Sequence, residues 1–362
     1  MTTRAFRKSS IKDVAQKAGV STTTVSYFVN GREDVCAPRT AERIRTAIAE
    51  LQYTPSSLTR GLRHGATHTI GVCLYSPLDP ELMYGNLFFE RLWRGVVREA
   101  DSADLSMLHY PLSVRGGTKS DGFLDGRVDG LLFHGLDGAR AKKVVQAGMP
   151  AVMLPRSKDL PDGCGAVSAD EEQTIGLALD HLFSLGHRRI AHFAGPARQV
   201  SHAETGINKP DDIALLRLEA FTSQMEAKGL FDPLLIGFAD AWQNVDEKAM
   251  NTIVKWRALP DPPTAVLCAN DALACAVMSA ANSLGIRVPE ALSIVGIDDS
   301  PEAREGAIPI TSVAVPVEDI GRQAVRSLQR LMSGEPAEAC RVAVPVTEIV
   351  VRGSTSQCVM NR

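Results

Sequence analysis

Residues 11–30 constrain this chain more than any other stretch, because they predict two short helices joined by a tight turn. In the first helix, apolar residues recur at the i, i+3, i+4 and i+7 spacing of one face: Ile11, Val14, Ala15 and Ala18. Ser10 can cap this helix, and Asp13, three residues later, can complete a capping box. Gly19 then allows the left-handed backbone that a sharp exit from a helix requires.

The second helix is predicted to expose a polar face. Ser21 is its candidate N-cap. Its apolar side is formed by Val25, Phe28 and Val29. The other side carries small hydroxyls, a phenol and an amide: Thr22, Thr23, Ser26, Tyr27 and Asn30. Such side chains suit close approach to phosphates and to base edges in the major groove of DNA.

A third helix completes a small head. The charge distribution also favours DNA as the partner of this head. Pro38 suits the first turn of this helix, whose apolar stripe follows: Ile44, Ala47, Ile48 and Leu51. We therefore expect a helix-turn-helix head over residues 1–54. Residues 1–66 contain eleven basic and five acidic side chains, a formal charge of +6, whereas the remainder carries −9. This asymmetry indicates a polyanion-binding head on an acidic body.

Residues 55–66 form a short connection whose structure the sequence leaves open. Its candidate helix, residues 55–63, is shorter than the roughly 12–15 residues at which an isolated helix becomes even marginal in water. Gly61 weakens a helix there by about 1 kcal/mol relative to alanine. The segment is either a hinge that becomes helical only when docked or a plain linker.

Residues 67–362 predict an α/β body. Short apolar runs alternate with helical patterns, which is typical of parallel sheets covered on both faces. The number of strands favours two doubly wound lobes over one sheet. We expect the first lobe over residues 67–170 and 316–340, and the second over residues 171–315 and 341–355. In such folds, ligands bind beyond the carboxyl ends of the strands.

Several classes of function are disfavoured. Seven scattered cysteines without a C-x-x-C pair fit a reducing cytoplasm rather than disulfides or zinc. No signal peptide or long apolar span is visible, so we expect no membrane partner. Catalytic and nucleotide-binding motifs such as G-x-S-x-G, H-E-x-x-H, Walker A and G-x-G-x-x-G are also missing. We therefore expect no enzyme activity, cofactor or metal.

The chain resembles the LacI (lactose repressor-like) family of bacterial transcription regulators over nearly its whole length. The head matches I-K-D-V-A-x-x-A-G-V-S-x-x-T-V-S at residues 11–26, and residues 55–62 resemble the family's hinge helix. Further matches lie in the body at residues 181–191 and 294–299. The resemblance implies a body like that of periplasmic binding proteins and a homodimer or tetramer on a palindromic operator. It also implies control by a small effector. Regulators of this family repress transcription more often than they activate it.

The resemblance further implies a set of DNA-contacting residues: Ser21, Thr22, Thr23, Thr24, Ser26, Tyr27, Asn30 and Leu62. Of these, Thr22, Thr23 and Tyr27 would contact base edges, and the other head residues would mostly contact phosphates. Leu62 matches a leucine that the family inserts into the minor groove, although it could also pack only against a partner hinge. Tyr27 stands where relatives often have arginine, so we expect an operator that differs at one base.

For the effector, the resemblance implies six residues: Phe88, Phe89, Arg217, Trp242, Asn270 and Asp298. A planar cation, an amide, a carboxylate and aromatic faces suit a sugar-like polyol or a nucleoside. Structural roles remain open for three of them: a surface charge for Arg217, a strand-end cap for Asp298 and plain core packing for Trp242. Two other functions also remain open, namely a transport-type solute-binding protein and a constitutive DNA-binding protein with a vestigial cleft.

Overall fold

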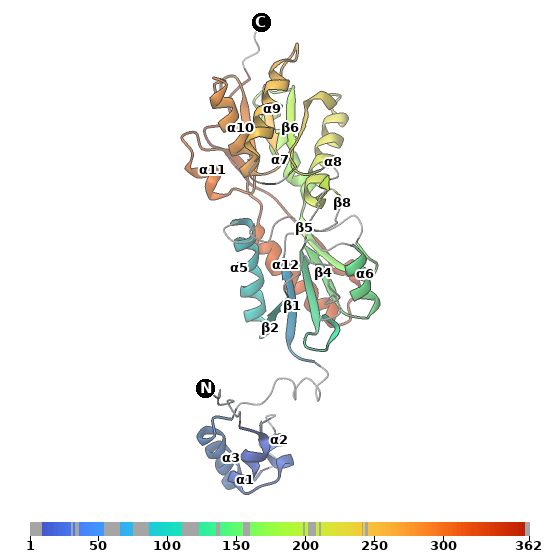
Figure 1. The fold of residues 1–362 in the computed structure, drawn as a ribbon, viewed down its shortest axis with the longest axis vertical. Helices are drawn as coiled ribbons and strands as arrows, with labels where there is room; N and C mark the ends of the chain where they lie inside the picture. Colours follow the sequence, from blue (N-terminus) through green and yellow to red (C-terminus); the bar gives the residue numbers. More distant parts are fainter. Residues whose placement is uncertain are drawn as a thin grey trace, which may run out of the picture. The chain divides into compact units, whose positions relative to one another are not determined.

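A computed structural model of the chain describes residues 9–29, 32, 36–53, 66–74, 87–110, 123–134, 138–154, 160–197, 200–201, 208–209, 211–240, 242 and 245–358. The chain divides into two compact units, Met1–His68 and Thr69–Arg362 (Figure 1). Two candidate DNA contacts, Asn30 and Leu62, lie outside the described residues, as do residues 55–65 of the predicted hinge.

The first unit contains three short helices: α1 (Ile11–Ala18), α2 (Thr22–Val29) and α3 (Pro38–Glu50). The predicted capping box is confirmed, because the amide of Ser10 donates to Asp13 at 2.7 Å and the amide of Asp13 donates to the Ser10 hydroxyl. Gly19 has a φ of 64° and ends α1. The Arg43 guanidinium of α3 donates to the carbonyls of Ala18 and Gly19, so α3 holds the turn between α1 and α2.

The first lobe of the second unit is a parallel sheet in the order β13-β5-β4-β3-β1-β2. Its strands are β1 (Thr69–Leu74), β2 (Ser106–His109), β3 (Gly130–His134), β4 (Ala151–Leu154), β5 (Gly165–Ala169) and β13 (Arg341–Val344). Helices α5 (Leu87–Ser102) and α12 (Val317–Met332) cover one face, and α6 (Gly138–Gln146) lies on the other. Alternate strand residues separate accordingly, with Leu132 on the α12 side and Leu131 on the α6 side.

The second lobe has the strand order β14-β12-β11-β10-β6-β9, parallel except for β14. Its strands are β6 (Ile190–Ala194), β9 (Ile236–Phe238), β10 (Ala265–Cys268), β11 (Ser293–Ile297), β12 (Thr311–Val313) and β14 (Ile349–Val350). Helices α7 (Glu171–Ser184) and α8 (Asp212–Ala227) cover one face, and α9 (Asp246–Arg257) and α10 (Asp271–Ser283) the other.

Shorter elements complete the described chain: the strands β7 (Val200–Ser201) and β8 (Asn208–Lys209), helix α11 (Pro301–Glu305), and 3-10 helices at Pro233–Leu235 and Ala337–Cys340. Among the described helices, none combines the length and the apolarity needed to cross a bilayer.

These two sheets and the helical head confirm the predicted fold class, but one predicted lobe boundary is wrong for residues 341–344. Residues 341–344 form β13, which pairs with β5 in the first sheet, with Arg341 opposite Ala166. The expectation that residues 341–355 belong to the second lobe therefore fails for β13, whereas β14 (Ile349–Val350) pairs with β12 in the second sheet. Strand alternation cannot show which sheet an edge strand joins, because its partner is distant in sequence.

Two glycines allow close contact between two helices of the first lobe, where α5 crosses α12. A Cβ placed on Gly95 would lie 1.9 Å from the carbonyl oxygen of Glu318, and one on Gly321 would lie 2.3 Å from that of Leu92. The two backbones therefore touch directly. This contact fixes α5, whose first two turns carry Phe88, Phe89 and Arg91.

Candidate functional site

The exposed face of α2 is the first candidate site. Thr22, Thr23 and Tyr27 are all exposed, and 40% of the Tyr27 surface remains accessible. Ser21 caps the helix as predicted, since the Thr24 amide donates to its hydroxyl at 3.0 Å. Thr24 is half-buried as a residue, and its hydroxyl shares a 2.8 Å hydrogen bond with that of Ser21.

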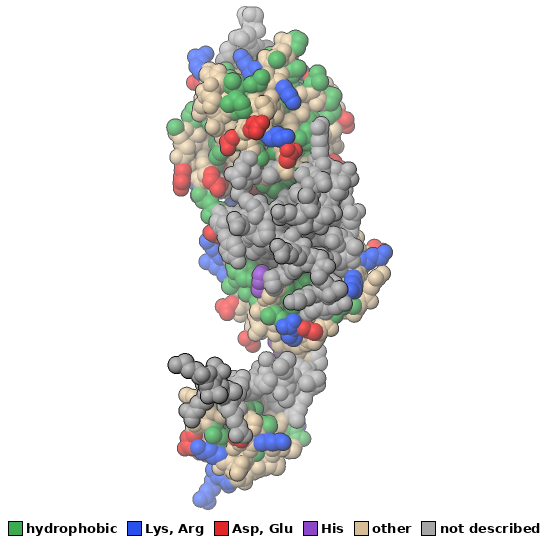
Figure 2. All heavy atoms as spheres, in the orientation of Figure 1, with side chains coloured by type: hydrophobic (Ala, Val, Ile, Leu, Met, Phe, Trp, Pro, Cys, Tyr) green, Lys and Arg blue, Asp and Glu red, His purple; other side chains and the backbone are tan. Residues whose placement is uncertain are grey.

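Ser26 differs from the expectation that it shares this exposed face. Only 5% of its surface is accessible, because the face of α2 turned toward α1 and α3 is wide enough to include it along with Val25 and Phe28. A basic group also lies beside Tyr27: the Arg32 guanidinium sits 5.3 Å from the centre of the Tyr27 ring. Figure 2 shows further lysine and arginine side chains extending from the head.

A buried arginine is the centre of the second candidate site. Arg217 of α8 is 3% exposed, and its Nε donates to Glu171 at 2.8 Å. Its Nη1 donates to the carbonyl of Ala269, and its Nη2 lies 3.6 Å from the Asp298 carboxylate. Burial alone would disfavour the cation, but the nearby Glu171 and Asp298 carboxylates outweigh it and raise the pKa of Arg217.

Asp298 follows the end of β11 in an unusual backbone conformation. Its φ is 109° and that of Asp299 is 48°, so two consecutive residues other than glycine have positive φ. Asp298 Oδ1 is buried and accepts no hydrogen bond from the described residues. Burial raises the pKa of Asp298 to about 7, against the opposing effect of Arg217. Near neutral pH this carboxyl can therefore donate to or accept from a ligand hydroxyl.

A small pocket lies beside Arg217 and is lined by both lobes. Phe88 and Leu92 of α5, Leu154 of β4 and Ile213 of α8 contribute to its wall. It encloses about 20 Å³, which is room for about one water molecule. A ligand the size of a sugar could occupy this place only if the surrounding groups moved apart.

The other predicted effector residues have structural partners. Asn270 caps α10, because its side-chain oxygen accepts the Leu273 amide at 2.8 Å. Trp242 packs against Gly195, where a Cβ would lie 2.7 Å from the indole. Phe89 contacts Phe88 edge-on, with ring centres 5.7 Å apart. The structure therefore brings together Arg217, Asp298 and Phe88, whereas it places Trp242 in a neighbouring apolar cluster.

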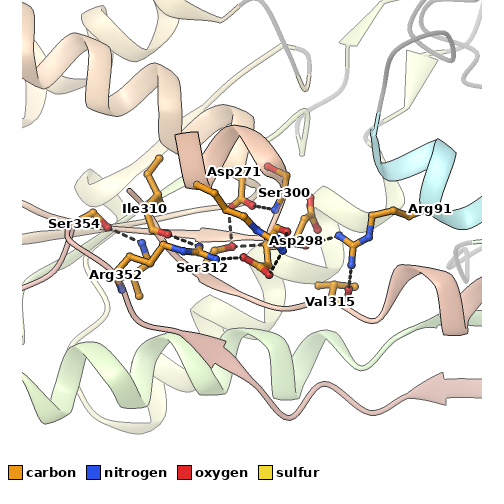
Figure 3. Close-up of polar contacts among 12 residues, drawn as sticks. Arg91, Asp271, Asp298, Ser300, Ile310, Ser312, Val315, Arg352 and Ser354 are labelled. Carbon is orange, nitrogen blue, oxygen red and sulfur yellow. Dashed lines mark hydrogen bonds and ion pairs between the residues drawn. The ribbon is translucent and has the colours of Figure 1, made fainter. Parts of the chain in front are cut away.

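Three further residues in this region were missed by the sequence analysis. Glu171, 8% exposed, is the main partner of Arg217. Asp271 accepts the Ser300 amide and the Ser312 hydroxyl, and burial raises its pKa to about 6 (Figure 3). Arg91 reaches from α5 to the carbonyl of Asp298. Within the described residues, no group of His, Cys, Asp and Glu side chains is arranged to hold a metal ion.

A helix-turn-helix head joined to a two-lobed α/β body is the architecture of a DNA-binding transcription regulator. Residues 10–56 match the model for bacterial regulatory proteins of the lacI family, and residues 179–355 match that for a periplasmic binding protein-like domain. The chain is 32% identical to the HTH-type transcriptional regulator CelR of Thermobifida fusca, covering 96% of this chain and 98% of CelR. This protein therefore belongs to the LacI family of bacterial transcription regulators, as its sequence motifs predicted.

Two solved structures extend the comparison to nearly the full chain. A lac repressor dimer bound to operator and the anti-inducer ONPF has a TM-score of 0.78 at 26% identity, covering 97% of this chain and 100% of that one. The complex of the regulator CelR with cellobiose has a TM-score of 0.66 at 26% identity, covering 96% and 100%.

Proposed function

We propose that this protein is a repressor that binds a palindromic operator as a homodimer. A small sugar- or nucleoside-like effector between the lobes controls its operator affinity. The observation that carries the proposal is the exposed polar face of α2, where Thr22, Thr23 and Tyr27 stand free of the head's core. The lac repressor dimer on its operator and CelR with cellobiose support the proposal. Sedimentation of the full chain distinguishes a dimer from a tetramer.

On this proposal the protein acts in the cytoplasm by binding and not by catalysis. Effector binding favours one arrangement of the lobes. That arrangement sets the positions in which the heads of the two subunits bind the operator. The effector changes operator affinity only as far as it binds the two arrangements with different affinity. Arg217, Asp298 and Phe88 are the proposed effector contacts, and Asn270, Phe89 and Trp242 are proposed to join them when the site opens.

Tyr27 is expected to set the base preference of the operator. In selection of bound fragments from random DNA, Tyr27→Arg should gain a preference for guanine at one position in each half-site. A good bidentate arginine–guanine contact discriminates by about 1–3 kcal/mol, which one tyrosine hydroxyl cannot match. Lys17→Gln is the control, because Lys17 pairs with Glu50 at 2.5 Å and should leave the selected sequence unchanged. Recovery of one identical site by the wild type and Tyr27→Arg would contradict this role.

Asp298 is expected to be needed for the effector response but not for operator binding. Asp298→Gly removes the carboxyl without backbone strain, because glycine tolerates a φ of 109°. Loss of a charged hydrogen-bond partner costs about 1.5–3 kcal/mol, so effector affinity should fall at least about tenfold. Thermal shift with sugars and nucleosides, cellobiose included, provides the measurement, with operator mobility shift alongside.

Asp240→Ala is the matched control in the second lobe, because Asp240 forms an exposed ion pair with Lys248. An unchanged effector response in Asp298→Gly would remove Asp298 from the site. If no ligand stabilises the wild type, a constitutive DNA-binding protein becomes the better account.

A further inference from the structure

Arg91 links the two lobes through backbone atoms. It lies in the first turns of α5, in the first lobe, and is half-buried. Its Nη1 donates to the carbonyl oxygen of Asp298 at 2.8 Å, and its Nη2 donates to that of Val315 at 3.1 Å (Figure 3). One planar guanidinium therefore holds two separate segments at a fixed spacing.

Both acceptor carbonyls, of Asp298 and Val315, belong to segments whose positions would change if the lobes moved relative to each other. Val315 lies between β12 of the second lobe and α12 of the first lobe, so it belongs to a connection between the lobes. The Asp298 carbonyl belongs to the turn in which Asp298 and Asp299 both have positive φ. Such a conformation persists only when its surroundings hold it.

Contacts within the second lobe hold the rest of this turn. The Asp299 carboxylate accepts from Arg352 and, at 2.5 Å, from Arg304. The Asp299 amide donates to the Ser312 hydroxyl at 3.0 Å, and the Ser300 amide donates to Asp271 at 2.7 Å. Asp298 differs, because its carboxyl faces Arg217 while its carbonyl is held from the other lobe.

We propose that Arg91 is a positioning residue that couples the Asp298 turn to the first lobe. A ligand that engages the Asp298 carboxyl moves the Asp298 carbonyl, and the guanidinium carries that movement to α5 and to the connection at Val315. Arg91 thus affects how strongly ligand and operator influence each other rather than how tightly either binds alone. This inference rests on the proposed function and deepens it.

Hydrogen–deuterium exchange on the full chain tests, without any ligand, the clamp formed by the two hydrogen bonds from Arg91 to the carbonyls of Asp298 and Val315. In Arg91→Gln, the amides of residues 298–300 should exchange at least tenfold faster than in the wild type. Arg98→Gln is the matched control, because Arg98 lies on the same helix and pairs with Glu318 inside the first lobe. Arg91→Lys keeps the positive charge but not the two-pronged guanidinium. Its amides at residues 298–300 should be protected from exchange more than in Arg91→Gln and less than in the wild type. Equal exchange at residues 298–300 in Arg91→Gln and Arg98→Gln would overturn the proposal.

A second measurement separates coupling from simple loosening of the fold. With cellobiose as the first probe, the ratio of operator affinities with and without ligand should fall at least fivefold toward one in Arg91→Gln. The same ratio should persist in Arg98→Gln. If Arg91→Gln kept the wild-type ratio of operator affinities with and without ligand, the coupling role would be refuted, even if amide exchange at residues 298–300 had increased. If the wild type responds to no sugar or nucleoside, the proposed function fails, and the exchange measurement alone then decides for or against the clamp.

Discussion

Replacing Arg217 with methionine is expected to lower the free energy of unfolding of the second unit by about 3–5 kcal/mol, because two buried carboxylates lose their common cation. Glu171 is 8% exposed and 2.8 Å from Arg217, so its charge has no ready access to water. Asp298 loses the group that holds its pKa down to about 7. Urea unfolding of the full chain, followed by circular dichroism, measures the loss.

The pH dependence of this loss has a definite sign. The pKa of Asp298 in the folded wild type, about 7, already exceeds its ordinary value of 3.8, and losing Arg217 raises it further. Between about pH 4 and pH 7 the folded wild type and the folded mutant both hold a proton that the unfolded chain has released, so both lose stability alike as pH rises. Above about pH 7 the folded wild type also releases this proton and its stability levels off, whereas the mutant continues to lose stability. The defect should therefore be larger at pH 8 than at pH 6.

A double variant provides the control for Arg217. Arg217→Met with Glu171→Met removes both charges of the closest pair and should recover most of the lost stability, since an apolar pair of similar size is often neutral. If the double variant were no more stable than Arg217→Met alone, the cost would lie in packing and not in unpaired charge.

Gly95→Ala is expected to destabilise the first lobe by about 2–3 kcal/mol net, even though alanine is the better helix former by about 1 kcal/mol. The added methyl would lie 1.9 Å from the Glu318 carbonyl oxygen, so α5 and α12 must separate. Calorimetry of the full chain measures the change. Gly176→Ala in α7 is the matched control, because the nearest side-chain atom there is 3.5 Å away, and it should stabilise slightly. Equal stability of both variants would show that the crossing tolerates a methyl group.

Local chemistry explains why the head could be predicted from sequence. The Ser10–Asp13 capping box, the turn at Gly19 and Pro38 at the start of α3 each act within a few residues, and the structure contains all three. Ser26 could not be placed, because its burial depends on how α1 and α3 close over α2. Similarly, β13 joins the first sheet through pairing with β5, far away in sequence.

The polar groups between the lobes could be predicted only in part. Family motifs indicate Arg217, Asn270 and Asp298, but the neighbours of these residues depend on segments that meet only in the folded chain. Glu171 reaches Arg217 from 46 residues away, and Arg91 reaches Asp298 from 207 residues away. Neither pairing leaves a periodic pattern in the sequence.

The strand order also has a consequence for synthesis. The second lobe's parallel strands, β6, β9, β10, β11 and β12, are translated with no first-lobe strand between them. The first lobe needs α12 and β13, which are translated after them. About 175 residues separate β5 from β13, so at about 5–20 residues per second the ribosome needs roughly 9–35 s to deliver the missing edge. During that interval the apolar side of the first sheet has no α12 to cover it. The nascent chain is therefore expected to depend on chaperones mainly through its first lobe, because β1 to β5 are translated before the second lobe and α12 and β13 after it.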